Sequence, residues 1–253
     1  MKLKKILPLL MLPMLIASCG KSSDESQKDS VSKPDNTITS SKTESSTSTG
    51  QNSSSASTSA SDTTTSDKFT MEAEYTDLTG KKGAGYSGGC SGKEMVQKDE
   101  GGKANASNGY WVGYLYVSNL SVDFVFNSTK AIDDVTLTLR LSAEIKDIVL
   151  TSDNYKVNVN GTDIDDYGTI NLSGTSTSDS DNYVRPFSNH KLKKKISLVE
   201  GENTIRLITA NSDGMGGTMY ATAPMVDAVT LSDFKDTNLS YNKIEDNLSL
   251  FEE

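Results

Sequence analysis

Apolar and polar residues alternate along most of the chain between Lys68 and Asp233. This period of two is typical of β-strands with one buried face, and no segment shows the spacing of an amphipathic helix. Asn160-Gly161, a strong hairpin-turn signal, follows one alternating segment, and the run from Glu200 to Asn203 separates two others. About nine or ten short strands at this spacing predict an all-β fold, an antiparallel sandwich of two sheets. The clearest alternating segments are residues 69–73, 122–126, 135–141, 155–159, 192–198, 204–208 and 225–231.

Residues 19–67 have a different composition. Ser and Thr make up 26 of the 48 residues from Gly20 to Asp67, and this stretch has no aromatic residue. Such a segment cannot bury enough apolar surface to offset the entropy of ordering it. We therefore expect a disordered tether, followed by a sandwich domain at residues 68–233.

The chain begins like a secretory signal. Lys2, Lys4 and Lys5 precede an apolar run from Ile6 to Ile16 that is too short to span a bilayer comfortably. The run ends on small residues before Cys19, and so residues 1–18 resemble the signal peptide and lipobox of a bacterial lipoprotein. This resemblance implies cleavage before Cys19, lipidation of its thiol with palmitate among the acyl chains, and anchoring on the extracellular side of the bacterial cell membrane. The alternative is an ordinary signal peptide with an incidental cysteine.

The other end of the chain, residues 234–253, is a polar tail. Its scattered apolar residues, Leu239, Ile244, Leu248 and Phe251, are only loosely spaced for one helix face. We expect this tail to be frayed or weakly helical.

The cysteine content and the net charge limit how the domain can be stabilised and which partners it can bind. With Cys19 carrying lipid, no intramolecular disulfide can form, so the domain must be stabilised by its core or by a metal. Three of the 25 basic residues lie in the signal and all 34 acidic residues lie after it, which gives the mature chain a charge of −12. So acidic a protein repels nucleic acid and anionic headgroups, and we expect it to meet the membrane only through its lipid.

Glu72 and Glu74 lie two residues apart in an alternating segment, so both carboxylates are expected on one face of a strand. Two like charges at this spacing repel each other unless a cation or water separates them. A hard cation such as Ca²⁺, which prefers oxygen ligands, would resolve the repulsion. A solvated polar face is the alternative.

Several short motifs follow one another in an order that resembles carbohydrate-binding modules of families 6 and 35, over nearly all of residues 69–231. They are EAE at 72–74, NGYWVGYL at 108–115, FN at 126–127, VTLTLR at 135–140, VNG at 159–161, LVEGENTI at 198–205 and PMVDAV at 224–229. The last motif departs from the family pattern at Met225, where Asn is usual.

The resemblance implies a β-jelly-roll sandwich with a structural Ca²⁺ where the first and last strands meet. Carried over by position, Glu72, Glu74 and Asp227 would supply side-chain oxygens to this ion. A backbone carbonyl near Asn105 would add a further ligand.

Aromatic residues decide sugar binding, because a pyranose has an apolar C–H face that stacks on a flat ring. The resemblance places Trp111 as the ring platform of a cleft at the loop end. Trp111 and its neighbour Tyr110 are both candidate sugar-binding residues. Alternation requires one of the two to face outward, and we favour Trp111, with a core position as the alternative. The second platform of the family falls nearest to Phe187, and Asn211 is similar to the residue that binds sugar hydroxyls.

Catalysis has little support in the sequence. The single histidine, His190, lies beside a lysine run, and a metal between Glu72 and Glu74 would neutralise both carboxylates as acid and base. We expect no catalytic residues and predict a non-catalytic, cell-surface carbohydrate-binding lipoprotein whose partner is a polysaccharide or other glycan. The alternative is a surface adhesion or interaction protein whose sandwich binds protein or acts as a spacer. A small glycan hydrolase is a third candidate.

Overall fold

A computed structural model describes residues 67–85, 88–144, 146–174, 186–210, 223–235 and 237–252. The expected signal peptide, the lipidated Cys19, the tether and Asn211 lie outside these ranges. None of the helices within them is both long and apolar enough to cross a bilayer.

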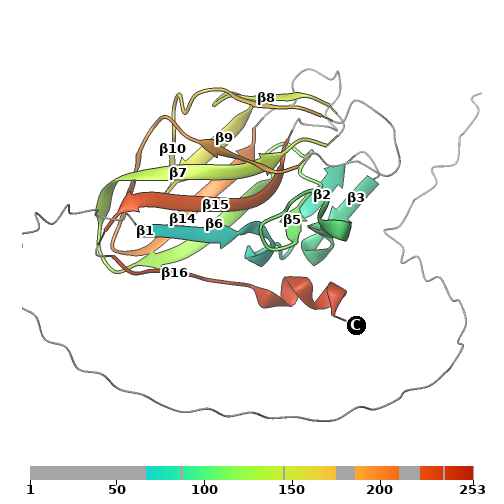
Figure 1. Ribbon diagram of the computed structural model, residues 1–253, viewed down its shortest axis with the longest axis horizontal. Coiled ribbons are helices and arrows are strands. Elements are labelled where there is room, and N and C mark those ends of the chain that lie inside the picture. Colours follow the sequence, from blue (N-terminus) through green and yellow to red (C-terminus); the bar gives the residue numbers. More distant parts are fainter. Residues whose placement is uncertain are drawn as a thin grey trace, which may run out of the picture. The chain divides into compact units, whose positions relative to one another are not determined.

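The described residues form two large antiparallel sheets (Figure 1). The first sheet has the strand order β12-β7-β15-β5-β4, with β1 added along β15 and β13 along β7. The second has the order β10-β9-β14-β6-β16, and β2-β3 and β8-β11 form two small two-stranded sheets. This arrangement confirms the predicted fold class, an all-β antiparallel sandwich of jelly-roll type.

The strands of the first sheet are β1 (Asp67–Glu72), β4 (Val96–Lys98), β5 (Tyr110–Val112), β7 (Ile132–Ser142), β12 (Ser188–Lys191), β13 (Ile196–Leu198) and β15 (Met225–Phe234). Those of the second are β6 (Ser121–Ser128), β9 (Tyr155–Val159), β10 (Thr162–Asp163), β14 (Gly201–Thr209) and β16 (Leu239–Tyr241). The remaining elements are β2 (Lys82–Gly85), β3 (Gly88–Ser91), β8 (Ile148–Leu150), β11 (Ile170–Leu172) and four 3₁₀ helices, η1 (Ala73–Tyr75), η2 (Gly92–Met95), η3 (Glu100–Gly102) and η4 (Glu245–Phe251).

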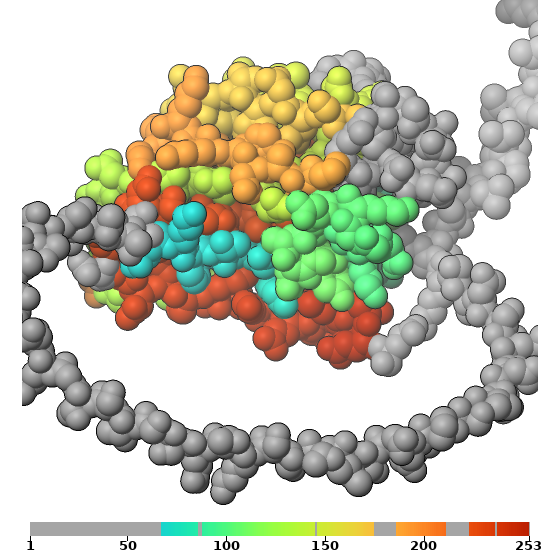
Figure 2. All heavy atoms as spheres, viewed as in Figure 1, coloured from blue at the N-terminus to red at the C-terminus, as the bar shows by residue number. Residues whose placement is uncertain are grey.

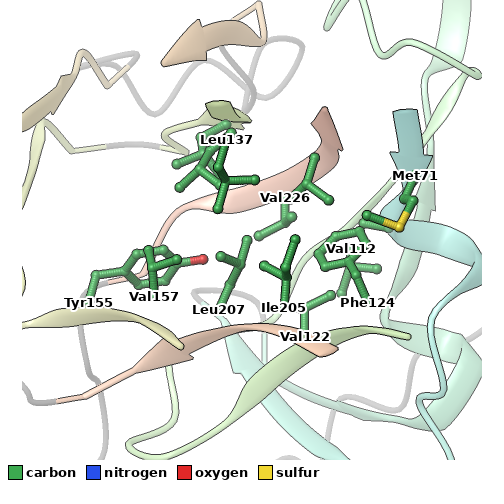
Figure 3. Packing of buried hydrophobic residues seen from close by; sticks show 14 of the residues in the cluster. Met71, Val112, Val122, Phe124, Leu137, Tyr155, Val157, Ile205, Leu207 and Val226 are labelled. Carbon is green, nitrogen blue, oxygen red and sulfur yellow. The ribbon is translucent and has the colours of Figure 1, made fainter. Parts of the chain in front are cut away.

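The alternating pattern places the core between the two sheets. In β7 the side chains of Leu137, Leu139 and Leu141 are fully buried, whereas the residues between them face the other side of the sheet. Figure 3 shows Leu137 and Val226 of the first sheet facing Val157, Ile205 and Leu207 of the second. A second, smaller cluster of buried apolar residues lies apart from this core.

In the described residues after β15, a strand and a short 3₁₀ helix are found where the sequence predicted a frayed or weakly helical tail. Phe234 is the last residue of β15, β16 pairs with β6, and η4 follows with Leu248 and Phe251 packed against the core. The apolar residues do not match one helix face because they are shared between a strand and a short 3₁₀ helix. The sandwich therefore extends beyond the predicted boundary at Asp233.

Candidate functional site

The pairing of β1 with β15 brings three carboxylates together. Glu72 is the last residue of β1 and lies opposite Ala228, the neighbour of Asp227. Glu74 follows in η1, because the strand ends at Glu72 and the chain turns there, so the prediction that both glutamates share one strand is wrong. The charges of Glu72 and Asp227 nevertheless act on Glu74, and we call these three residues the carboxylate site.

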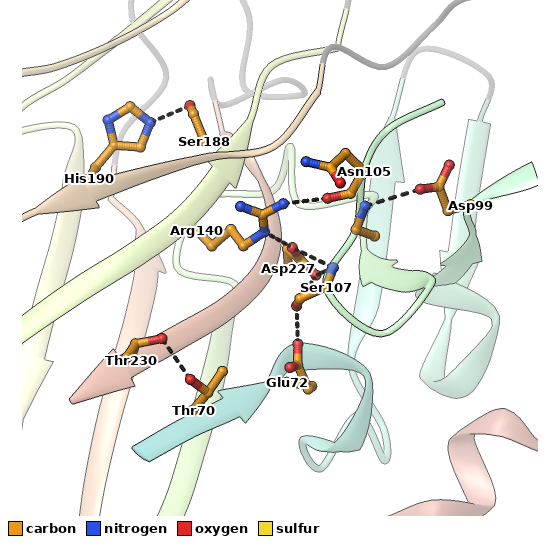
Figure 4. A network of polar contacts seen from close by, with 11 residues as sticks. Thr70, Glu72, Asp99, Asn105, Ser107, Arg140, Ser188, His190, Asp227 and Thr230 are labelled. Atoms are coloured by element: carbon orange, nitrogen blue, oxygen red, sulfur yellow. Dashed lines mark hydrogen bonds and ion pairs between the residues drawn. The ribbon is translucent and has the colours of Figure 1, made fainter. Parts of the chain in front are cut away.

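Ser107 joins two of these carboxylates. Its hydroxyl donates to Glu72 and, over 3.0 Å, to Oδ1 of Asp227. Its backbone N–H donates to both carboxylate oxygens of Asp227, at 3.1 and 3.0 Å. Figure 4 shows Ser107 lying between Glu72 and Asp227.

Arg140 approaches the carboxylate site from β7. Its Nε donates to Asp227 and its Nη2 to the backbone carbonyl of Asn105, so the guanidinium lies between the two (Figure 4). Asp99 holds the same loop by accepting from the N–H groups of Ala104 at 2.9 Å and Ala106 at 3.0 Å. The Asn105 carbonyl is thus fixed at the edge of the carboxylate site.

Glu74 and Asp227 are both fully buried, whereas Glu72 is half-buried. Oε1 of Glu74 accepts a hydrogen bond of 2.7 Å from Nδ2 of Asn108, while its buried Oε2 has no hydrogen-bond partner among the described residues. Burial, together with the charges of Glu72 and Asp227, raises the pKa of Glu74 to about 7, although the hydrogen bond from Asn108 opposes this rise.

Burial also raises the pKa of Glu72 and of Asp227, although hydrogen bonds from Ser107 to both and from Arg140 to Asp227 oppose this effect. Arg140 forms an ion pair with Asp227, and the charges of Arg140 and Lys243 both act on Glu72, so two positive charges face three carboxyl groups. In the described ranges, no three Asp, Glu, His or Cys side chains stand close enough to ligate one metal ion as they are placed. The donor set still fits a hard cation, because it offers carboxylate and carbonyl oxygens and includes the unpaired Oε2 of Glu74 within the described structure.

A second group of residues, which we call the aromatic cluster, packs beside the carboxylate site. Its members are Ala104, Trp111, Phe187 and Met225. The rings of Trp111 and Phe187 lie 5.6 Å apart at an angle of 50°, and the Phe187 N–H donates to the carbonyl of Ala104 at 2.9 Å. Trp111 is 7% exposed, and its indole N–H finds no acceptor in the described part of the chain.

Alternation along β5 separates Trp111 from Tyr110. Val112 is fully buried in the main core and Tyr110 packs against that core, whereas Trp111 belongs to the aromatic cluster. The Tyr110 ring contacts Phe251 of η4 at 5.1 Å. The structure thus brings Trp111 and Phe187 together, places Tyr110 on the other side of the strand, and covers most of the indole.

Three residues of one loop connect the two groups. Ala104 and Ala106 pack in or against the aromatic cluster, and the carbonyl of Asn105 between them accepts from Arg140. Sequence reasoning did not identify Arg140, Ser107 or Asn108 as site residues. Arg140 had a usable signal, since it is the one charged residue in the alternating segment 135–141 of β7.

His190 lies on β12, half-buried. Its Nε2 shares a hydrogen bond of 2.8 Å with the hydroxyl of Ser188, two residues earlier on the same strand (Figure 4). Burial lowers the pKa of His190. The contact is local and does not join His190 to the carboxylate site.

No family model and no curated protein sequence matches the chain. Solved structures similar to it include a family 35 carbohydrate-binding module from an environmental isolate, at 11% identity and a TM-score of 0.43, covering 70% of this chain and 98% of that one. A family 35 module from Cellvibrio japonicus is 12% identical with a TM-score of 0.42, covering 68% and 96%. A family 35 module from Clostridium thermocellum is 20% identical with a TM-score of 0.39, covering 65% and 98%.

Proposed function

We propose that the sandwich is a non-catalytic carbohydrate-binding module whose glycan meets the aromatic cluster and the adjoining edge at Arg140 and Asn105. The observation that carries this proposal is the Trp111–Phe187 pair, which packs outside the main core and holds an indole N–H without an acceptor in the described structure. Sugars need both an apolar ring contact and hydrogen-bonding groups, and a guanidinium and an amide lie one loop away. Glu72 and Glu74 serve structure in this proposal, because they are hydrogen-bonded within the carboxylate site.

The packing of the aromatic cluster determines how a sugar reaches Trp111. With the indole 7% exposed, a pyranose stacks on it only after a side chain of the aromatic cluster, such as Phe187, moves aside. If the sugar stacks on Trp111 in this way, Phe187→Ala should raise the affinity for it. If the sugar is instead held between both rings, Phe187→Ala should lower the affinity. Single-site binding of this kind is weak, and several copies on one surface would provide avidity.

Binding of the full chain to a panel of immobilised glycans tests this function. We expect the wild type to bind one glycan class and Trp111→Ala to lose that binding. Trp111→Phe is the milder variant if the first fails to fold, and Tyr110→Phe, on the other side of β5, is the matched control that should bind as the wild type does. A wild type that ignores every glycan class would favour the adhesion or spacer alternative, and turnover of a glycan would favour the hydrolase.

We further propose that the carboxylate site binds a structural Ca²⁺ through Glu72, Glu74, Asp227 and the Asn105 carbonyl. All three carboxyl groups have raised pKa values, first because they are buried, so their charged forms are poorly stabilised. A bound cation would stabilise these charged forms. The ion would neutralise the carboxylates and hold β1 and β15 to the loop that carries Ala104 and Ala106. At 100 times its dissociation constant, Ca²⁺ would stabilise the domain by about 2.7 kcal/mol, so chelation should lower the melting temperature by roughly 5–10 °C. An unchanged melting curve in excess chelator would count against the ion.

Our proposal for the cellular location of the module rests on residues outside the described ranges. We propose that Cys19 carries the lipid, that the Ser- and Thr-rich segment is a tether, and that the domain faces the extracellular side of a bacterial cell membrane. Incorporation of a labelled palmitate analogue into the wild type and its loss in Cys19→Ala would support this. Equal labelling of both proteins would refute it.

A further inference from the structure

The C-terminal segment 239–251, which contains β16 and η4 and which we call the C-terminal strap, lies against the chain that carries the glutamates. In Figure 2 the red C-terminal residues border the cyan β1 and the green segment near it. The rings of Phe251 and Tyr110 are in contact, and Lys93 of η2 donates to Asp246 at 3.3 Å and to Ser249 at 2.8 Å. The C-terminal strap is thus docked by both apolar and polar contacts.

The polar groups of the C-terminal strap donate to the backbone of residues 72–76. The hydroxyl of Tyr241 donates to the carbonyl of Glu72 at 2.9 Å, and the N–H of Ile244 donates to that of Tyr75 at 2.8 Å. Nδ2 of Asn247 donates to the carbonyls of Glu74 and Thr76, at 2.8 and 2.7 Å. Four carbonyls within five residues therefore have their donors in one distant segment.

Asn247 has a specific reason to be polar inside the fold. It is 5% exposed, and the short helix η1 ends too soon to pair its own last carbonyls. An amide group supplies two N–H donors, so Asn247 alone satisfies two buried carbonyls that would otherwise lack partners. These carbonyls belong to Glu74 itself and to a residue two positions later.

The path of this backbone decides where the two glutamate side chains lie. Glu72 is held on one side by its pairing with β15 and on the other by Tyr241. Glu74 lies beyond the last strand pair, and its backbone carbonyl is held by Asn247. The C-terminal strap thus fixes the segment on which the carboxylate site depends.

We propose that Asn247 and Tyr241 are positioning residues for the carboxylate site, which set its affinity for a divalent cation without contacting the ion. This inference rests on the proposed calcium site. Coupling between sites is reciprocal, so an ion that binds more tightly when the C-terminal strap is docked also holds it in place. The C-terminal strap is then part of the binding module.

Calcium titration of the full chain by calorimetry tests the proposal. We expect Asn247→Ala to raise the Ca²⁺ dissociation constant about tenfold, within the range typical of coupled sites, and Tyr241→Phe to raise it less. Ser240→Ala is the matched control in the C-terminal strap, because this residue of β16 is exposed and is not among the residues that contact Lys93, Tyr110 or residues 72–76 above. Each variant is first shown by circular dichroism in chelator to keep the β-sandwich, and Tyr241→Phe, which keeps the ring, serves if Asn247→Ala unfolds.

Proteolysis supplies a readout that does not depend on calorimetry. Lys243 is exposed and precedes η4, so endoproteinase Lys-C would release the fragment 244–253 when the C-terminal strap opens. Docking of the C-terminal strap raises the affinity for Ca²⁺ by some factor, and Ca²⁺ should slow this cleavage of the wild type by about the same factor, because the coupling is reciprocal. A purely structural role would lower stability in chelator and leave the Ca²⁺ dissociation constant unchanged.

The outcomes separate the two proposals. If the wild type binds Ca²⁺ and both variants bind it with the wild-type constant, the positioning role is wrong while the calcium site stands. If the wild type binds no Ca²⁺, the calcium site itself fails, and the positioning role fails with it.

Discussion

Replacing Glu74 with Gln should stabilise the calcium-free protein at pH 8 and destabilise the calcium-loaded protein. Glu74 is fully buried, and only its Oε1 has a hydrogen-bond partner in the part of the chain that the structure describes. Gln has nearly the same shape and can still accept the hydrogen bond from Asn108 through its amide oxygen. The substitution therefore removes a buried charge while it keeps the packing.

The pKa of Glu74 gives the size of the effect. Burial raises this pKa from 4.5 to about 7, and each pKa unit corresponds to about 1.4 kcal/mol, so the charged form costs the folded protein about 3 kcal/mol. Between pH 4.5 and 7 the folded state binds a proton that the unfolded state has released, so the free energy of unfolding falls as the pH rises through this window. Above it the full penalty is present, and Glu74→Gln escapes it. The variant should then melt roughly 6–12 °C higher than the wild type in chelator at pH 8, and about equally at pH 4.

Urea unfolding followed by circular dichroism, in chelator and in Ca²⁺ at pH 4, 6 and 8, measures both halves of this prediction. Glu202→Gln, at an exposed position of β14, is the control for loss of a carboxylate and should follow the wild type. Parallel pH profiles for wild type and Glu74→Gln in chelator would refute the reasoning about the buried charge. Equal stabilisation of both proteins by Ca²⁺ would refute the role of Glu74 as a ligand.

Three further substitutions test the packing by urea unfolding. Phe124→Ala should lower the free energy of unfolding by about 3–5 kcal/mol, because the ring is fully buried between the sheets. Asn203→Ala should lower it by about 2–4 kcal/mol, because the buried amide makes four hydrogen bonds around its hairpin, whereas the exposed Asn171→Ala should change it by less than about 0.5 kcal/mol. Gly83→Ala should lower it by about 1–3 kcal/mol, because a Cβ there would collide with the carbonyl of Tyr114. Equal losses at Asn171 and Asn203, or none at Phe124 or Gly83, would contradict these assignments.

The sandwich could be predicted because its information is local and periodic. Leu137, Leu139 and Leu141 repeat at the period that puts them all on one face of β7, and the structure buries all three. Asn160 and Gly161 both have positive φ, 51° and 85°, as the tight turn between β9 and β10 requires. Period and turn chemistry do not mark where a strand ends, however, so the sequence placed Glu74 on β1.

The surroundings of the carboxylates depend on contacts between distant segments. Ser107 meets Asp227 across 120 residues and Glu72 across 35, and no spacing along the chain reports such a meeting. The family resemblance could point to the three carboxylates. It could not point to the donors Ser107, Asn108 and Arg140, because these reach the carboxylates only through the packing of the loop, β7 and β15. Trp111 shows the same limit. Alternation predicts on which side of β5 its ring lies, but it does not predict that Phe187 packs against that ring.

The tail shows why polar composition alone is a poor guide to whether a segment docks. Its few apolar side chains contact different surfaces, with β16 extending the second sheet and Phe251 meeting Tyr110, so they follow no single period. Its polar groups, which predict a solvated end, instead meet carbonyls that a short helix leaves without internal partners. A segment that packs against unpaired backbone carbonyls is held by its hydrogen-bond donors as well as by its buried apolar side chains. For residues 239–251 the amide of Asn247 is therefore as informative about docking as the ring of Phe251, and a sequence search weighted by hydrophobicity misses it.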